Sequence, residues 1–369
     1  MSSTVTDLDR RFMAACIRLS RRHLGRTGTN PSVGTLIVAD EGKGPIIVGH
    51  GVTALGGRPH AEPVALGEAG ERARGATAYV TLEPCAHHGR TPPCAEALVR
   101  AGVARVVVAA TDPDDRVSGR GYEILRSAGI EVVPGVLADE ARSVLSSYLT
   151  RSEKKRVEVT LKLAVSADGM IGRADAGQVP ITGDVARAQS HVLRAEMDAI
   201  LIGIGTALED NPQLTCRLPG LSQRSPLRVV LDRHARLPLT SRLMQSVSDA
   251  PLAIATTMPR TPSAQLLEGA GARLIACEEH DGRIALPELL DDLAAQGVSS
   301  LLVEGGAAVA KAFLDEALAD RVILFESDVV VGANGIAAPF TRANLSADYA
   351  ASGEWLFGAD RCNEFVRRS

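Results

Sequence analysis

The 369-residue sequence has no long apolar run, no excess of basic residues and few cysteines. No stretch approaches the ~18 apolar residues that a membrane span requires. The first thirty residues contain several arginines but no uninterrupted apolar run of the kind found in a secretory leader. The net charge of -4 provides no basic field to hold a nucleic-acid backbone. We therefore expect a cytoplasmic protein with neither a membrane nor a nucleic-acid partner.

The cysteines are too sparse and too scattered for the disulfide framework of a small secreted domain. We expect them to be free thiols or metal ligands. The six are Cys16, Cys85, Cys94, Cys216, Cys277 and Cys362.

The chain is longer than one hydrophobic core usually serves, so two domains are expected. In the first half, short β-rich runs alternate with helical stretches, which predicts an α/β domain. The charged run RSEKKR at 151–156 precedes a new apolar strand and predicts the boundary, with domains at 1–150 and 151–369. The second half again alternates, which favours a mostly parallel sheet covered on both faces. After Gly332 the pattern is weak and predicts no structure.

A cluster of metal-binding residue types occupies TLEPCAHHGRTPPC, residues 81–94, and RPHAEPVAL lies about twenty residues upstream. One imidazole and two thiolates, from His60, Cys85 and Cys94, make three ligands. Three protein ligands and an open fourth position are typical of a catalytic zinc, whereas a structural zinc normally has four. The alternative is that the cysteines are inert core residues. We favour a catalytic zinc site because the pieces occur together.

Glu62 stands two residues after His60, where a carboxylate could carry the proton of a zinc-bound water. This H-x-E spacing, followed by Pro84-Cys85 and a second cysteine, is the signature of zinc deaminases acting on nucleobase-like rings. That signature has two residues between the cysteines, whereas eight intervene here. The longer loop carries His87, His88 and Arg90, which suit a polar or phosphorylated substrate, although a solvated loop is the simpler alternative. His87 and His88 could also compete as ligands.

In the second half, a strand ends in Glu304 and a double glycine and then opens a helix, within SLLVEGGAAVAKAF. A helix N-terminus reached through glycines can hold a phosphate. This segment lacks the full G-x-G-x-x-G spacing, as does GIGTALEDNP from Gly203, so tight turns between strand and helix are an equal alternative.

These motifs resemble the bifunctional diaminohydroxyphosphoribosylaminopyrimidine deaminase and 5-amino-6-(5-phosphoribosylamino)uracil reductase family of bacterial riboflavin biosynthesis. The resemblance spans roughly Phe12 to Gly335. Its deaminase half is carried by HAE, AYVTLEPCAHHGRTPPC, AGVARVVVA, DP and GRG, and its reductase half by LKLAVSADG, LRVVLD and LLVEGG. It implies a cytidine-deaminase-like three-layer α/β domain followed by a dihydrofolate-reductase-like α/β domain.

For the deaminase half, the resemblance implies zinc ligands at His60, Cys85 and Cys94 and a proton donor at Glu62. Asn30, in TNPSVG, matches a segment that lines the pyrimidine pocket, and a turn role before Pro31 is an equal alternative. The implied reaction converts a diaminopyrimidinone into an aminouracil that keeps its ribosylamino phosphate.

For the reductase half, the resemblance implies NADPH and hydride transfer that reduces the ribosyl group to a ribityl chain. The implied contacts to the cofactor are Ala164, Thr206, Asp210 and the helix start from Gly306 through Ala307 and Ala308. Those to the phosphorylated substrate are Arg194, Leu214, Arg217 and Glu304. Lys162 and Asp168 match the shared LKxxxSxDG segment, and we expect Lys162 to make a polar contact in the reductase cleft rather than a surface ion pair.

Three positions depart from the family pattern. Gln178 and Pro180 replace a common serine and tryptophan, so contacts there are not carried over. Arg233 stands where a small hydroxyl residue is common, and we hypothesise that it pairs with the 2′-phosphate of NADPH. The alternative function is a single-activity zinc deaminase of another nucleobase-like substrate with a degenerate second domain. The oligomeric state is open, and an apolar surface joining copies into a homo-oligomer is compatible with the sequence.

Overall fold

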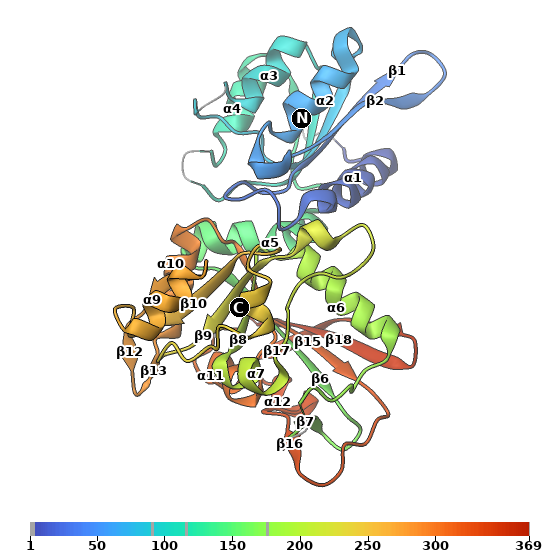
Figure 1. The fold of residues 1–369 in the computed structure, drawn as a ribbon. Coiled ribbons are helices and arrows are strands. Elements are labelled where there is room, and N and C mark those ends of the chain that lie inside the picture. Colours follow the sequence, from blue (N-terminus) through green and yellow to red (C-terminus); the bar gives the residue numbers. More distant parts are fainter. Residues whose placement is uncertain (1–3, 90–91, 115–116, 175–176, 369) are drawn as a thin grey trace. The chain divides into compact units, whose positions relative to one another are not determined.

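The computed structural model of the chain describes residues 4–89, 92–114, 117–174 and 177–368. Its contacts divide the chain into two compact units, Met1–Lys155 and Arg156–Ser369, which are shown as ribbons in Figure 1. Within the described part of the chain, no helix combines the length and the apolar character needed to cross a membrane.

The first unit is built on a five-stranded sheet in the order β2-β1-β3-β4-β5. β1 runs antiparallel to both β2 and β3, whereas β3, β4 and β5 are parallel. The central strands are almost wholly buried, as the apolar runs predict, because helices cover both faces. The strands are β1 Gly34–Asp40, β2 Pro45–Val52, β3 Thr77–Leu82, β4 Arg105–Ala110 and β5 Glu131–Val133.

The helices of the first unit form two layers. α1 and α5 contact one another and the central strands, and α2, α3 and α4 pack together elsewhere on the sheet (Figure 1). The charged run at 151–156 is largely helical, because α5 continues through it to Lys154. The helices are α1 Asp7–Ser20, α2 Ala61–Ala69, α3 Cys94–Ala101, α4 Arg120–Ser127 and α5 Ala138–Lys154, with short 3-10 turns at Arg21–His23, Leu55–Gly57 and Gly70–Ala73.

The second unit contains a nine-stranded sheet in the order β11-β10-β9-β8-β14-β6-β15-β18-β17. The first seven strands in this order are parallel, which confirms the expectation of a mostly parallel sheet. They are β11 Arg273–Ala276, β10 Leu252–Thr256, β9 Leu227–Leu231, β8 Ala199–Gly203, β14 Ser300–Val303, β6 Glu158–Val165 and β15 Arg321–Glu326. Two small antiparallel pairs lie outside this sheet, β7 Met170–Arg173 with β16 Gly335–Ala337 and β12 Glu279–His280 with β13 Arg283–Ile284.

Helices follow most of the parallel strands. α11 begins directly after Gly306, as the double glycine predicts, and α7 occupies a place where the glycines also allowed a simple turn. They are α6 Asp184–Glu196, α7 Ile204–Asp210, α8 Arg242–Gln245, α9 Pro262–Gly269, α10 Leu286–Ala295, α11 Ala307–Asp315 and α12 Arg342–Leu345, with a 3-10 turn at Ser222–Arg224.

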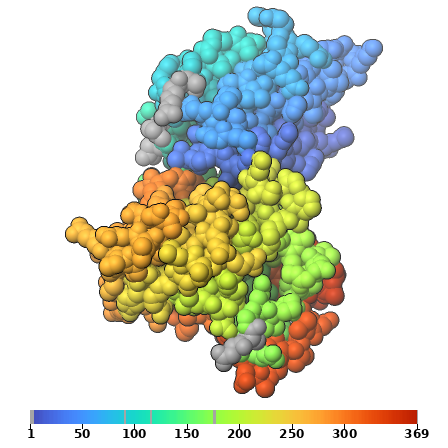
Figure 2. Space-filling view, viewed as in Figure 1, coloured from blue at the N-terminus to red at the C-terminus, as the bar shows by residue number. Residues whose placement is uncertain are grey.

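The weakly patterned stretch after Gly332 ends in an antiparallel hairpin, β17 Tyr349–Phe357 and β18 Asp360–Arg367. β18 pairs with β15, so the hairpin completes one side of the large sheet. Most of β17 is solvent-accessible and its pairing is interrupted by a bulge between Ala351 and Gly353, which explains the missing alternation of apolar residues. The closing strands, red in Figure 2, form part of the outer surface of this unit.

Candidate active sites

In the first unit, three elements bring one imidazole and two thiols together. His60 is the residue immediately before α2, Cys94 is the first residue of α3, and Cys85 lies in the loop after β3. The Nδ1 atom of His60 is 3.7 Å from the Sγ of Cys85 and 3.4 Å from the Sγ of Cys94. All three donor atoms lie within 4.8 Å of one another.

This donor set fits zinc. One nitrogen and two sulfurs at this spacing can surround a single ion, and three protein ligands leave a fourth tetrahedral position open. The buried Nε2 of His60 has no hydrogen-bond partner among the described residues, so Nδ1 is the ring nitrogen that faces the thiols. Among the described residues, this is the one such group of metal-binding side chains.

The contact between the two thiols shifts their pKa values in opposite directions. A hydrogen bond from Cys94 lowers the pKa of Cys85 to about 4, and the same contact raises the pKa of Cys94. Glu62, in the first turn of α2, is 4% exposed. Burial, followed by the charge of Cys85, raises its pKa to about 7. A carboxyl group with this pKa can both accept and release a proton near neutral pH.

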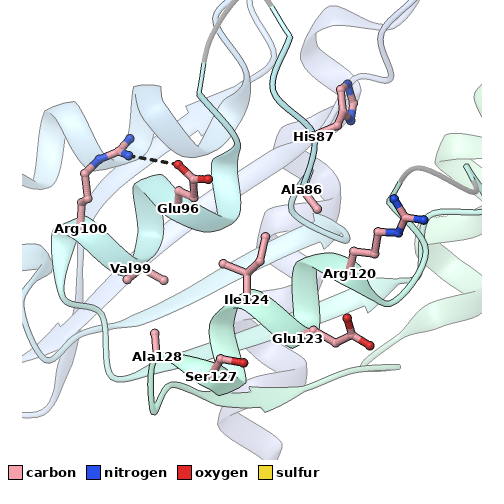
Figure 3. Close-up of a pocket in the computed structure, with 10 residues that line it drawn as sticks. All are labelled: Ala86, His87, Glu96, Val99, Arg100, Arg120, Glu123, Ile124, Ser127 and Ala128. Atoms are coloured by element: carbon pink, nitrogen blue, oxygen red, sulfur yellow. Dashed lines mark ion pairs between the residues drawn. The ribbon is translucent and has the colours of Figure 1, made fainter.

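The other residues expected at this site lie around it. Asn30 is partly buried beside Gly57, where its side-chain nitrogen would be 2.5 Å from an added Cβ. His88 is largely exposed and its Nε2 is 3.5 Å from Glu96. Arg90 lies outside the described residues. His87 has a buried Nδ1 without a partner in the described structure, and it lines a groove of about 800 Å³ together with Arg120 at the start of α4 (Figure 3).

In the second unit, a cavity of about 630 Å³ lies at the ends of β6, β8 and β14 and the starts of α7 and α11. It gathers residues that are far apart in the sequence. Its lining includes ten of the twelve residues expected at the reductase site, namely Lys162, Ala164, Arg194, Thr206, Asp210, Arg217, Glu304, Gly306, Ala307 and Ala308.

Three charged side chains in this cavity form a cluster. Arg194 donates two hydrogen bonds of 2.8 Å to the two carboxylate oxygens of Glu304, and both side chains are nearly buried. Burial would raise the pKa of Glu304, but the charges of Arg194 and Lys162 outweigh it and lower the pKa to about 2. Burial lowers the pKa of Lys162, whose Nζ lies 5.4 Å from the ring centre of Phe325. The cavity therefore contains a carboxylate held by Arg194, with the Lys162 amine close enough to interact with it electrostatically.

The start of α11 fits a nucleotide phosphate. The amide of Gly306 donates to the hydroxyl of Thr206 at 3.1 Å, and a Cβ at Gly306 would lie 3.0 Å from that hydroxyl. Glycine thus keeps the backbone open where the helix begins, and helix N-termini attract phosphate groups. The cavity is large enough for a nicotinamide beside a sugar phosphate, so its residues fit NADPH.

Two expected residues lie elsewhere. The side chain of Leu214 is buried in the apolar cluster with Ile200 and Val230, which leaves only its backbone for a substrate contact. Arg233 follows β9, outside the cavity lining, and its guanidinium lies 3.3 Å from Glu279 and also contacts the carbonyl of Gly282. Asp168, in turn, accepts hydrogen bonds from the amides of Val331 and Gly332.

Residues on α6 were missed by sequence reasoning. Arg187, Ser190 and His191 line the cavity on the same helix as Arg194, at the three- and four-residue spacing of one helix face. That spacing from Arg194 is a signal that could have identified them. Burial and the charges of Arg194 and Arg217 lower the pKa of His191 to about 4, so it is neutral at physiological pH. Gln178 and Pro180 also line the cavity.

Both units match known families. Residues 6–110 match the cytidine and deoxycytidylate deaminase zinc-binding region, and residues 157–349 match the RibD C-terminal domain. The chain is 38% identical to the riboflavin biosynthesis protein RibD of Aquifex aeolicus over 328 residues, covering 89% of each chain. RibD of Escherichia coli K12 is 38% identical over 337 residues, covering 88% of this chain and 89% of its own.

Solved structures are similar over the whole chain. Acinetobacter baumannii RibD superposes with a TM-score of 0.85 at 36% identity, covering 98% of this chain and 99% of that one. A diaminohydroxyphosphoribosylaminopyrimidine deaminase/5-amino-6-(5-phosphoribosylamino)uracil reductase of Thermotoga maritima gives a TM-score of 0.84 at 33% identity, with the same coverage.

Fold and sites thus define a two-domain enzyme that joins a zinc-dependent deaminase to an NADPH-dependent reductase. The cytidine-deaminase-like and reductase folds expected from the sequence are confirmed. The chain belongs to the RibD family of bifunctional deaminase-reductases of riboflavin biosynthesis.

Proposed function

We propose that residues 1–150 deaminate diaminohydroxyphosphoribosylaminopyrimidine to 5-amino-6-(5-phosphoribosylamino)uracil, and that residues 151–369 then reduce its ribosyl group to ribityl with NADPH. The observation that carries the first step is the convergence of His60, Cys85 and Cys94 beside the buried carboxyl of Glu62. For the second step it is the cavity that combines a glycine-opened helix start with the Arg194, Glu304 and Lys162 cluster.

In the deamination, His60, Cys85 and Cys94 would hold zinc through Nδ1 and the two Sγ atoms. Zinc in such a site lowers the pKa of water to about 7 and so supplies a nucleophile at neutral pH. Glu62 would accept one proton of the attacking water and pass it to a ring nitrogen. It would then move the second proton, from the new hydroxyl on the ring carbon, to the amino group, which leaves as ammonia while the ring carbonyl forms. The carboxyl of Glu62 is buried in the first turn of α2, two residues after His60, which places it beside the ligands for both transfers.

Substrate contacts in the first unit come from groups around the zinc ligands. Asn30 is proposed to hydrogen-bond the pyrimidine ring, and His88 and Arg90 to face the ribosyl phosphate. His88 supports this because it is exposed and its weak contact to Glu96, at 3.5 Å, leaves room for an anionic partner.

In the reduction, bound NADPH would supply a hydride to the ribosyl carbon that carries the amino substituent. The bond between that carbon and the ring oxygen breaks, and the ring oxygen takes a proton from water and becomes a hydroxyl of the ribityl chain. We propose that Ala164, Thr206, Asp210 and the Gly306–Ala308 backbone bind the cofactor. Arg217 is proposed to bind the substrate phosphate, because guanidinium groups match phosphate oxygens. Arg194 holds Glu304 in one orientation through two hydrogen bonds, so Glu304 can accept a hydrogen bond from a ribose hydroxyl.

Arg233 is proposed to recognise the 2′-phosphate of NADPH. It follows β9 at the carboxyl end of the parallel sheet, where cofactor-binding residues gather in such folds. Its contact with Glu279 is 3.3 Å long and partly exposed, so a phosphate could replace it.

The thiol ligands favour a reducing compartment, and we propose that the enzyme works in the cytoplasm. We also propose that it forms a homo-oligomer through the edge strand β17, where Trp355 and Leu356 are 47% and 69% exposed. Light scattering of the purified protein tests this, and a monomer at micromolar concentration would contradict it.

Two assays on the zinc-loaded protein test the function. Ammonia release from the phosphoribosylated diaminopyrimidinone is measured first without NADPH, and NADPH oxidation is followed after the cofactor is added. Both signals are expected. Ammonia alone would restrict the chain to deamination, and the absence of both would contradict the proposed substrate.

A further inference from the structure

The carboxylate of Glu83 is buried close to the proposed zinc ligands without being one of them. Glu83 follows β3 and stands two residues before Cys85, and only 3% of it is exposed. Its Oε2 accepts a hydrogen bond of 3.2 Å from the amide of Gly119, and its Oε1 accepts one of 3.1 Å from the amide of Gly121. The Glu83 side chain thus links two elements. One is the end of β3, which leads to the zinc ligand Cys85, and the other is the start of α4.

The turn at Gly119-Arg120-Gly121 is shaped to receive this carboxylate. Gly119 has a φ of 76°, a left-handed conformation that glycine adopts without strain. At Gly121 an added Cβ would lie 2.2 Å from the carbonyl oxygen of Pro84, so only glycine allows the backbone of the ligand loop to approach α4 this closely. The GRG motif therefore has a structural partner in the Glu83-Pro84 segment.

Cys85 is fixed on its other side by α3. Its Sγ accepts the amide of Cys94 at 3.3 Å, and its carbonyl accepts the amide of Ala95 at 3.2 Å. The amide of Glu83 donates to the carbonyl of Ala110 at the end of β4. The Cys85 segment is therefore held on one side by α3, which supplies Cys94, and on the other by Glu83, whose carboxylate is bound at the start of α4. Figure 3 shows Ala86 and His87, the next residues of this loop, beside Arg120 at the start of α4.

We propose that Glu83 is a positioning residue for the zinc ligand Cys85, with the amides of the Gly119-Arg120-Gly121 turn as its receptor. The proposal rests on the proposed function, in which His60, Cys85 and Cys94 hold zinc. A glutamate that merely caps α4 would stabilise the helix and leave the metal unaffected. A positioning role requires that the thiolate of Cys85 loses its alignment with the other two ligands when the carboxylate is lost.

Glu83→Gln separates these two roles. The amide group keeps the size of the side chain but points an NH₂ donor at one of the two backbone amides, so one contact becomes donor against donor. We expect zinc affinity, measured by competition with a chromophoric chelator, to fall about 10–100-fold, as for other residues that orient metal ligands. In the cobalt-substituted protein, the thiolate-to-cobalt absorption should shift or weaken. Glu123→Gln is the matched control, because Glu123 is an exposed carboxylate on α4, the helix that receives the Glu83 side chain.

The melting temperature checks the fold of the first unit, and NADPH oxidation with the aminouracil substrate checks that the second unit is unaffected. A lower melting temperature with wild-type zinc affinity and cobalt spectrum would overturn the proposal. If Glu83→Gln does not fold, Glu83→Asp keeps the charge but is one methylene too short to reach both amides, and wild-type metal properties there would overturn it equally. Wild-type protein that binds no zinc would instead contradict the proposed function itself.

Discussion

The two active sites are assembled from the chain in opposite ways. The deaminase site takes its ligands and its proton carrier from His60 to Cys94, and its ligands sit at helix starts or in the adjoining loop. The reductase cavity draws charged groups from β6, α6 and the end of β14, with Lys162, Arg194 and Glu304 separated by up to 142 positions (304 − 162). The contiguous site can be read from its local motif, whereas the residues of the dispersed site were assigned to it only through the family resemblance, and the sheet is what brings them together.

Disabling the deaminase site alone should leave the reductase site active. Glu62→Gln removes the group that moves protons, so we expect kcat for ammonia release to fall by about 10²–10⁴. NADPH oxidation with the already deaminated aminouracil should be unchanged, because that reaction uses the second unit. Glu68→Gln, at an exposed carboxylate on the same helix that pairs with His50, is the control and should retain both activities. Equal loss in the two variants would contradict a catalytic role for Glu62.

The stability and activity of the reductase site should depend on the buried ion pair between Arg194 and Glu304. Arg194→Met leaves the carboxylate of Glu304 without its bidentate partner, and removing one member of a buried pair costs about 3–5 kcal/mol. We expect the free energy of unfolding of the second unit to decrease by about this amount. NADPH oxidation should be lost, and ammonia release should be retained. Trp355 is the single tryptophan, so its fluorescence during urea unfolding reports on the second unit.

The control for that experiment is an exposed pair. Lys311→Met breaks the 2.8 Å contact with Asp315 on α11, which is worth less than about 1 kcal/mol because water screens it. If Arg194→Met and Lys311→Met lower the free energy of unfolding equally, burial does not make the Arg194–Glu304 pair more important for stability than an exposed pair.

Cofactor choice tests a residue that lies outside the cavity lining. Arg233→Ala should reduce the preference for NADPH over NADH, because a hydrogen bond to a charged group contributes about 1.5–3 kcal/mol, or roughly 10–100-fold. Glu279→Gln should raise the preference, since it frees the guanidinium from its ion pair. The comparison of kcat/KM for the two cofactors measures both. An unchanged ratio in Arg233→Ala would show that the 2′-phosphate binds elsewhere.

The smallest effect concerns acid stability. The pKa of Glu304 is lowered to about 2 in the folded unit, against about 4.5 for an ordinary glutamate. Its contribution to stability is therefore complete above pH 4.5 and is lost as the pH falls toward 2. We expect Glu304→Gln to reduce the slope of unfolding free energy against pH in that window by up to about 1.4 kcal/mol per pH unit. Unfolding curves at pH 4.5 and 3.5 suffice, and parallel slopes would contradict the prediction.

Sequence reasoning succeeded where the pattern is local. The alternation of strands and helices in both halves and the helix start after Gly306 were predictable, because burial fixes residue type at regular spacing. The contact between Glu83 and the Gly119-Arg120-Gly121 turn was not, since nothing in either segment specifies its partner. The burial of Leu214 and the pairing of Arg233 with Glu279 were hidden for the same reason.

The C-terminal hairpin has a consequence for how the gene can be shortened or tagged. The match to the RibD C-terminal domain ends at residue 349, yet Asp360 in β18 accepts the amide of Gly183 at 2.8 Å, immediately before α6, the helix that carries Arg194. A chain truncated shortly before Asp360 would keep every residue that lines the reductase cavity. It would nevertheless lose the hydrogen bond that fixes the start of α6. Variants truncated near residue 350 should therefore lose NADPH oxidation and keep ammonia release.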